Sequence, residues 1–102
     1  MTKRDWTFLT NHGRVLAYIA KYPDSTTEEI AHKVGITLRA VQKIISDLER
    51  DGYLEHQKQG RRNRYTVHSE LPMRHRLEHD HLVGDILVVL GCKPQQVGAD
   101  KS

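Results

Sequence analysis

Apolar residues in the first half of the chain recur at helical spacing. In residues 11–21 the N-cap type Thr10 precedes an apolar face, and Pro23 ends the predicted helix because the residue before a proline is pushed out of the α region. That face consists of Val15, Leu16, Ile19 and Ala20. We therefore expect a first helix over Asn11–Lys21.

A second and a third helix are predicted with only a short turn between them. Thr26 and Glu29 match a capping box, and Gly35 is placed to end a second helix of about two turns in a left-handed conformation. The third helix is expected over residues 37–51, ending before Gly52. Its apolar face consists of Val41, Ile44, Ile45 and Leu48. Two helices joined by so short a turn cross steeply, which predicts a helix-turn-helix.

The apolar period changes to two after Gly52. Residues 53–58 and 64–68 favour strands, and residues 59–63 supply the turn of a β-hairpin, the wing. A last helix is expected over residues 75–90, after Leu71-Pro72.

These elements predict an α+β fold class, mainly α. It consists of a winged helix-turn-helix, with three helices and a β-hairpin wing, and a C-terminal dimerisation helix. We assign residues 1–71 to the DNA-binding domain, 72–91 to the C-terminal helix and 92–102 to a disordered tail.

Basic residues are concentrated in the predicted wing. The chain has a formal net charge of +3 and a pI of about 9.2, which favours acidic partners without identifying one. Residues 58–64 contain no acid, and their basic residues are Lys58, Arg61, Arg62 and Arg64.

The composition also excludes several classes of protein. Cys92 is the single cysteine, so no internal disulfide or cysteine-built zinc site is expected, as in a reducing cytoplasm. The N-terminus lacks the apolar run of a signal peptide, and the longest apolar stretch, residues 86–90, is too short to span a bilayer. No acid, base and nucleophile converge and no glycine-rich phosphate loop occurs, so we expect no enzyme and no cofactor. Because no apolar stretch is long enough to span a bilayer, we also expect no membrane partner.

The segment 26–54 resembles the winged-helix regulators of bacteria and archaea. The likeness is strongest in Ser46-Asp-Leu-Glu-Arg-Asp-Gly-Tyr-Leu followed by a basic hairpin, and the groups it resembles are MarR-like and ArsR-like. Residues 6–12 and 67–75 also look like a subgroup of short, single-domain regulators. The resemblance implies a cytoplasmic DNA-binding transcription regulator that forms a homodimer.

The outward face of the third helix predicts contacts to double-stranded DNA. It combines cations, an amide and a hydroxyl, which pair with base edges and phosphates in a major groove. Arg39, Gln42 and Lys43 lie in the first half of the helix, where base readout is expected. The full predicted set is Thr37, Arg39, Ala40, Gln42, Lys43 and Ser46, with Arg50 at the far end of this face.

The wing is expected to contact the minor groove or its phosphates, since arginine responds to groove width. Its predicted DNA-binding residues are Lys58, Arg61, Arg62, Asn63 and Arg64. Loss of Arg61 and Arg62 should weaken binding to every sequence, whereas loss of Arg39 or Gln42 should alter sequence preference.

The last predicted helix is apolar on two sides, so one side is expected to pack on a second copy of the chain. The predicted dimer interface is Leu82, Val83, Ile86, Val89 and Leu90. His75 and His79 are four residues apart, but no second ligand cluster follows, so we favour packing histidines over a metal site or a pH-sensitive interface. Cys92 is expected to be exposed and passive, with redox sensing as the alternative.

Other uses of the same fold remain open. A winged-helix module can serve protein–protein contact or RNA binding, but such modules usually lose the basic wing, which this chain keeps. A replication or partition factor could use the same elements. Between repression and activation we favour repression, and the fold identifies neither an operator nor a sensed ligand.

Overall fold

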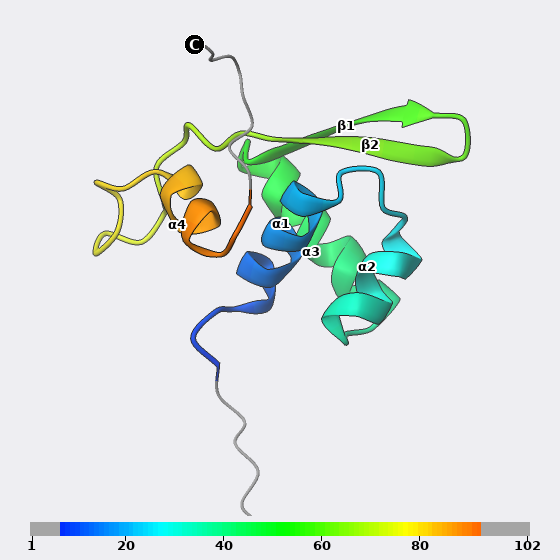
Figure 1. The fold of residues 1–102 in the computed structure, drawn as a ribbon, viewed down its shortest axis with the longest axis horizontal. Coiled ribbons are helices and arrows are strands. Elements are labelled where there is room, and N and C mark those ends of the chain that lie inside the picture. The colour runs from blue at the N-terminus through cyan, green and yellow to red at the C-terminus, as the bar shows by residue number, and fades with distance from the viewer. Residues whose placement is uncertain (1–6, 93–102) are drawn as a thin grey trace, which may run out of the picture.

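The computed structural model describes residues 7–92. Three helices, α1 (Asn11–Lys21), α2 (Thr27–Val34) and α3 (Leu38–Arg50), pack against one another beneath an antiparallel hairpin. The hairpin consists of β1 (Leu54–Gln59) and β2 (Arg62–Val67). A short helix, α4 (Val83–Val89), lies on the side of the molecule opposite the hairpin turn (Figure 1). The predicted fold class, α+β and mainly α with a winged helix-turn-helix, is confirmed.

The first three helices begin and end where local signals place them. The hydroxyls of Thr10, Thr26 and Thr37 accept hydrogen bonds from backbone N–H groups of the following first turns. Thr26 and Glu29 form the predicted capping box, and Gly35 ends α2 with a φ of +86°. The turn between α2 and α3 is therefore short and rigid, and the helix-turn-helix prediction is confirmed.

The hairpin turn is tighter than expected. Gly60 has a φ of +63° and Gln59 pairs with Arg62, so the turn holds only Gly60 and Arg61 instead of residues 59–63. A positive φ at the first turn position alone is the pattern of a two-residue type II′ turn. Arg62 and Asn63 consequently lie within β2, and the predicted placement of Arg62 at the tip is wrong.

One hydrophobic core joins all these elements. Leu54, Tyr65 and Val67 at the base of the wing are buried together with the predicted apolar faces of α1 and α3. The edge of β2 is fixed to the turn between α1 and α2, because the Tyr65 N–H donates to the Pro23 carbonyl over 2.9 Å. The wing is therefore anchored at its base, and its tip projects away from the core (Figure 1).

The last helix is much shorter than the predicted 75–90. Residues 74–82 form turns, and the His75 ring accepts a hydrogen bond from the Leu77 N–H over 3.0 Å, competing with helical pairing. The side chains of residues 74–82 are all exposed, so no buried face stabilises a helix there. The chain becomes helical only after Leu82, where Val83 and Leu87 enter the core.

Candidate nucleic-acid interface

The outward face of α3 is open to solvent along its length. Arg39, Gln42, Lys43 and Ser46 are exposed, and Ala40 is half-buried. These side chains point away from the buried face that packs on α1. The Thr37 hydroxyl accepts from the Ala40 N–H over 3.0 Å, so its oxygen is already engaged as the helix cap. The exposed cations and amide in the first half of α3 are Arg39, Gln42 and Lys43, and Ser46 is exposed in the second half.

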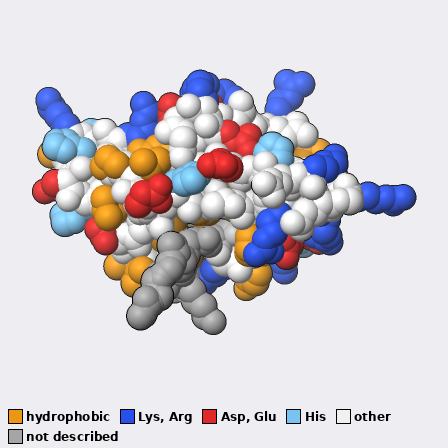
Figure 2. All heavy atoms as spheres, turned by 90° about the horizontal axis from the view of Figure 1, so that it is seen from above, with side chains coloured by type: hydrophobic (Ala, Val, Ile, Leu, Met, Phe, Trp, Pro, Cys, Tyr) orange, Lys and Arg blue, Asp and Glu red, His pale blue; other side chains and the backbone are white. Residues whose placement is uncertain are grey.

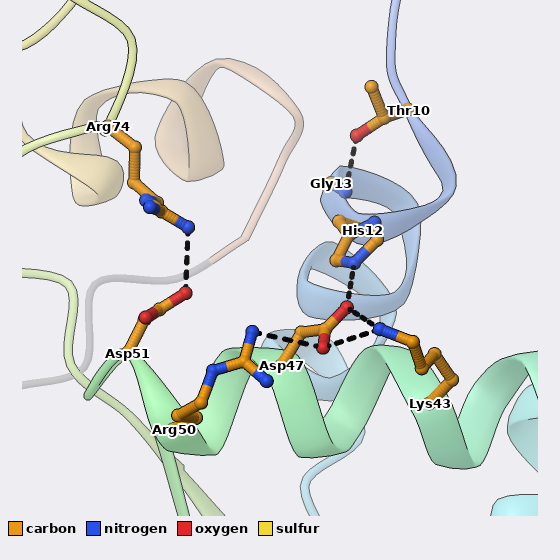
Figure 3. A network of polar contacts seen from close by, with 8 residues as sticks. All are labelled: Thr10, His12, Gly13, Lys43, Asp47, Arg50, Asp51 and Arg74. Carbon is orange, nitrogen blue, oxygen red and sulfur yellow. Dashed lines mark hydrogen bonds and ion pairs between the residues drawn. The ribbon is translucent and has the colours of Figure 1, made fainter.

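Asp47 organises the far half of this face. Its carboxylate accepts from Lys43 Nζ at 2.9 Å, from Arg50 Nη2 at 3.3 Å and from the His12 ring of α1 at 2.8 Å (Figure 3). Only 15% of the Asp47 side chain is exposed, against 70% for Lys43. The hydrogen bonds from His12 and then Lys43 lower the pKa of Asp47 to about 2. Asp47 thus fixes two cations on this face of α3 and connects α3 to α1.

The low pKa of Asp47 predicts an acid-dependent loss of stability. The carboxyl has a folded pKa of about 2 and an ordinary value of 3.8, so its stabilisation is complete above about pH 4 and is lost as the pH falls towards 2. We expect Asp47→Asn to be less stable than the wild type at neutral pH and to lose less stability over that acid range. Urea unfolding at a series of pH values measures this. Glu28→Gln is the control, and parallel pH profiles for the wild type and Asp47→Asn would contradict the assignment.

The basic residues of the wing divide into two groups. Arg61 lies in the turn and Lys58 lies two positions before it; both are exposed and form no ion pair with another residue of the described part of the chain. Arg64 Nη1 lies 2.6 Å from Asp24 Oδ1. Arg62 donates to the Asp24 carbonyl at 2.7 Å and to both carboxylate oxygens of Glu29 at 3.3 Å each. Arg62 and Arg64 therefore form ion pairs within the chain that the sequence did not predict, and their contact with DNA stays a prediction.

The ion pair between Arg62 and Glu29 also shifts the pKa of both side chains. The hydrogen bond from Arg62 lowers the pKa of the Glu29 carboxyl, and the same bond raises the pKa of Arg62. Both side chains are about half exposed, so the pair alone contributes little to stability. Asn63 is half-buried and directed at Tyr65 over 3.5 Å. Figure 2 shows Lys and Arg side chains extending from the tip of the wing at the right, and Lys58 and Arg61 lie at this tip without an acidic partner in the described chain.

The predicted dimer stripe on the last helix is split by the fold. Val83 is 6% exposed and belongs to the chain's own core, so its place in an exposed interface is wrong. Ile86 and Leu90 are half-buried, whereas Leu82 and Val89 are exposed. Two apolar residues outside the prediction, Leu77 and Val88, are exposed as well. Hydrophobic side chains gather at this end of the molecule, at the left of Figure 2.

Cys92 and the histidines of the 75–81 segment differ from expectation. Cys92 is 4% exposed, its Sγ lies 3.5 Å from the Ala17 carbonyl, and burial raises the pKa of the thiol. The expected exposure of Cys92 is wrong, as is its inclusion in a disordered tail; residues 93–102 lie outside the described part. His75 and His79 do not share a helix face, and residues 7–92 contain no group of three or more His, Cys, Asp or Glu side chains placed to hold a metal ion.

Two of the functional contacts gave no signal in the sequence. Lys43 and Asp47 are four residues apart on a predicted helix, so that pair could have been found. His12 is 35 positions from Asp47 and Asp24 is 40 positions from Arg64, and no local pattern connects residues so far apart.

None of the helices in residues 7–92 is both long enough and apolar enough to traverse a membrane.

Residues 9–55 match the family model described as winged helix-turn-helix DNA-binding. This segment contains α1, α2, α3 and the start of β1, so it includes the exposed face of α3 but not the tip of the wing. The match covers less than half of the chain, and over it the structure has the winged helix-turn-helix fold that the resemblance in residues 26–54 implies. No curated protein sequence matches the chain significantly.

Several solved structures share the fold. The chain is 24% identical to FabT of Streptococcus pneumoniae, solved in complex with DNA, with a TM-score of 0.52 over 57% of this chain and 43% of FabT. It is 22% identical to the PcaV regulator of Streptomyces coelicolor, solved with its natural ligand, with a TM-score of 0.54 over 61% of this chain and 46% of PcaV. For a mutant of Lactococcus lactis ZitR the identity is 15% and the TM-score 0.58, over 89% and 56% of the two chains. The chain thus spans about half the length of these structures.

Proposed function

We propose that this chain is a sequence-specific, double-stranded DNA-binding transcriptional regulator of the cytoplasm, acting as a homodimeric repressor. The single observation that carries the proposal is the exposed face of α3, where Arg39, Gln42 and Lys43 present two cations and an amide on a helix otherwise packed against the core. Guanidinium or ammonium groups suit guanine and an amide suits adenine in a major groove. FabT, which has a similar fold, was solved in complex with DNA, and this supports DNA as the partner.

The wing supplies the second part of the proposed interface. Arg61 lies in, and Lys58 just before, a two-residue turn that projects from the core, and their charges are not neutralised by a neighbouring acid of the described chain. Such cations contact phosphates or a narrow minor groove without reading bases directly. In this proposal α3 reads sequence and the wing tip adds affinity.

The homodimer is proposed to form through the apolar surface around α4. Leu77, Leu82, Val88 and Val89 are exposed there, and an exposed apolar patch on a small domain is typical of an interaction surface. A two-fold symmetric dimer presents two copies of α3 to half-sites about 34 Å apart, one turn of DNA.

Selection of bound duplexes from a random DNA pool tests this function. We expect enrichment of an inverted repeat whose half-sites are one helical turn apart, because a symmetric dimer reads a symmetric site. Selection without enrichment, or complete displacement of the DNA by an RNA competitor, would refute sequence-specific DNA binding. Sedimentation at micromolar concentration tests the dimer: the wild type should sediment as a dimer, Val89→Glu as a monomer and the control Arg76→Glu as the wild type.

A further inference from the structure

Two arginines of the wing hold it against the helix-turn-helix. Arg64 pairs with the Asp24 carboxylate at 2.6 Å, and Arg62 donates to the Asp24 carbonyl at 2.7 Å. Arg62 also contacts both oxygens of Glu29, each at 3.3 Å. We refer to these four residues, Asp24, Glu29, Arg62 and Arg64, as the wing clamp.

The register of the hairpin explains why both arginines reach the same place. Arg62 and Arg64 are two positions apart on β2, so they lie on one face of the hairpin, while Tyr65 points to the other face and into the core. The hydrogen bond from the Tyr65 N–H to the Pro23 carbonyl sets the edge of β2 beside the turn between α1 and α2. The position of the β2 backbone therefore places Arg64 opposite Asp24.

The acid partners of the clamp belong to the helix-turn-helix itself. Glu29 accepts the Thr26 N–H over 2.9 Å in the capping box that begins α2, and the same carboxylate receives Arg62. Asp24 lies in the turn that leads into α2, and its side chain contacts Arg64. A displacement of the wing would therefore break contacts at the start of α2, which packs directly against α3.

From these contacts we infer that Arg62 and Arg64 are positioning residues, which fix the direction of the wing relative to α3 by binding Asp24 and Glu29 rather than DNA. The inference rests on the proposed DNA-binding function. In this inference, Lys58 and Arg61 at the tip are the wing residues that contact DNA directly. Asp24 and Glu29, although acidic, contribute to DNA affinity because a wing ordered in advance loses less conformational freedom on binding.

A charge exchange between positions 24 and 64 distinguishes positioning from direct phosphate contact. Arg64→Glu places two acids against each other, and we expect it to weaken binding to the selected operator by about fivefold. Asp24→Arg with Arg64→Glu restores an ion pair in the opposite sense and keeps the net charge of the wild type. We expect this exchange variant to bind within about twofold of the wild type, with an unchanged salt slope, because no phosphate contact has been lost.

A matched control variant has the same net charge, but its new arginine does not face position 64. Glu28 is exposed in the first turn of α2 and forms no ion pair with a described residue, so Glu28→Arg with Arg64→Glu has the same net charge without facing partners. This control should bind as weakly as Arg64→Glu alone. If the exchange variant stays as weak as Arg64→Glu and its salt slope falls by about one, Arg64 contacts a phosphate and the inference is overturned.

The clamp is also measured without DNA, by amide hydrogen exchange in residues 54–67. Arg64→Glu should accelerate exchange in the wing, and the charge exchange should return it to the wild-type rate. Equal exchange rates in the wild type, Arg64→Glu and the exchange variant would overturn the clamp even if operator binding is normal. A wild-type protein that binds no DNA would instead refute the proposed function, and the exchange rates would then decide the clamp alone.

Discussion

Replacement of Arg39 and Lys43 by alanine in one variant is expected to abolish sequence-specific DNA binding. Both side chains are exposed on the first half of α3, and a good contact to a base edge contributes about 1–3 kcal/mol of discrimination. Because each site is used twice in a dimer, affinity for the selected operator should fall by at least about 100-fold. Affinity for a scrambled duplex should fall much less.

Fluorescence anisotropy with the two duplexes measures this difference. The control variant is Arg14→Ala with Lys33→Ala, which removes two cations from exposed or partly exposed positions on α1 and α2. Arg14 lies opposite the buried face of α1 that packs on α3, so the control should bind the operator nearly as the wild type does. Equal losses in the two variants would show that overall charge, and not the face of α3, determines binding.

Leu54→Ala is expected to cause the largest loss of stability among the residues of the wing. Leu54 is 1% exposed, begins β1, and packs in the cluster that joins the wing to the helices. Truncation of a fully buried leucine typically costs about 2–5 kcal/mol, from lost burial and from the cavity left behind. A domain of this size has only about 5–15 kcal/mol of stability, so a fraction of the protein would unfold near room temperature in mild denaturant.

The same substitution at an exposed position is the natural comparison. Leu77 is 76% exposed, and Leu77→Ala should change the free energy of unfolding of the monomer by less than about 0.5 kcal/mol. Urea unfolding followed by circular dichroism at low protein concentration measures both variants. A Leu54→Ala protein as stable as Leu77→Ala would show that the base of the wing is not part of the cooperative core.

Much of the fold follows from signals a few residues apart. The bounds of α1, the capping box at Thr26 and Glu29, and the left-handed Gly35 all occur as the sequence predicts. Such features are determined by side chains that bond to the backbone of their own turn, and they need no knowledge of the remaining chain. The exposed face of α3 follows in the same way, since the buried residues at helical spacing define the opposite side.

The less accurate predictions concern segments whose conformation depends on distant partners. Residues 74–82 contain helix-compatible residues, but none of them is buried, so the expected long helix is reduced to Val83–Val89. The hairpin turn is shorter than expected because Gly60 takes a positive φ, which brings Arg62 into β2. The first error arises from missing tertiary packing, and the second from a choice among turns that several sequences permit.

The sequence by itself determined the three helices, the presence of a wing, and the cations that α3 exposes, because periodicity and capping act over one or two turns. Only the tertiary structure decided which basic residues of α3 and of the wing pair with acids of the chain. Arg62 pairs with Glu29, 33 positions away, and Arg64 pairs with Asp24, 40 positions away. Asp47, which binds Lys43, also accepts a hydrogen bond from His12, 35 positions away. Such partners meet only after the core has brought the turn before α2 beside β2 and α1 beside α3. The physical reason is that an ion pair requires contact in space, which no spacing along the chain encodes.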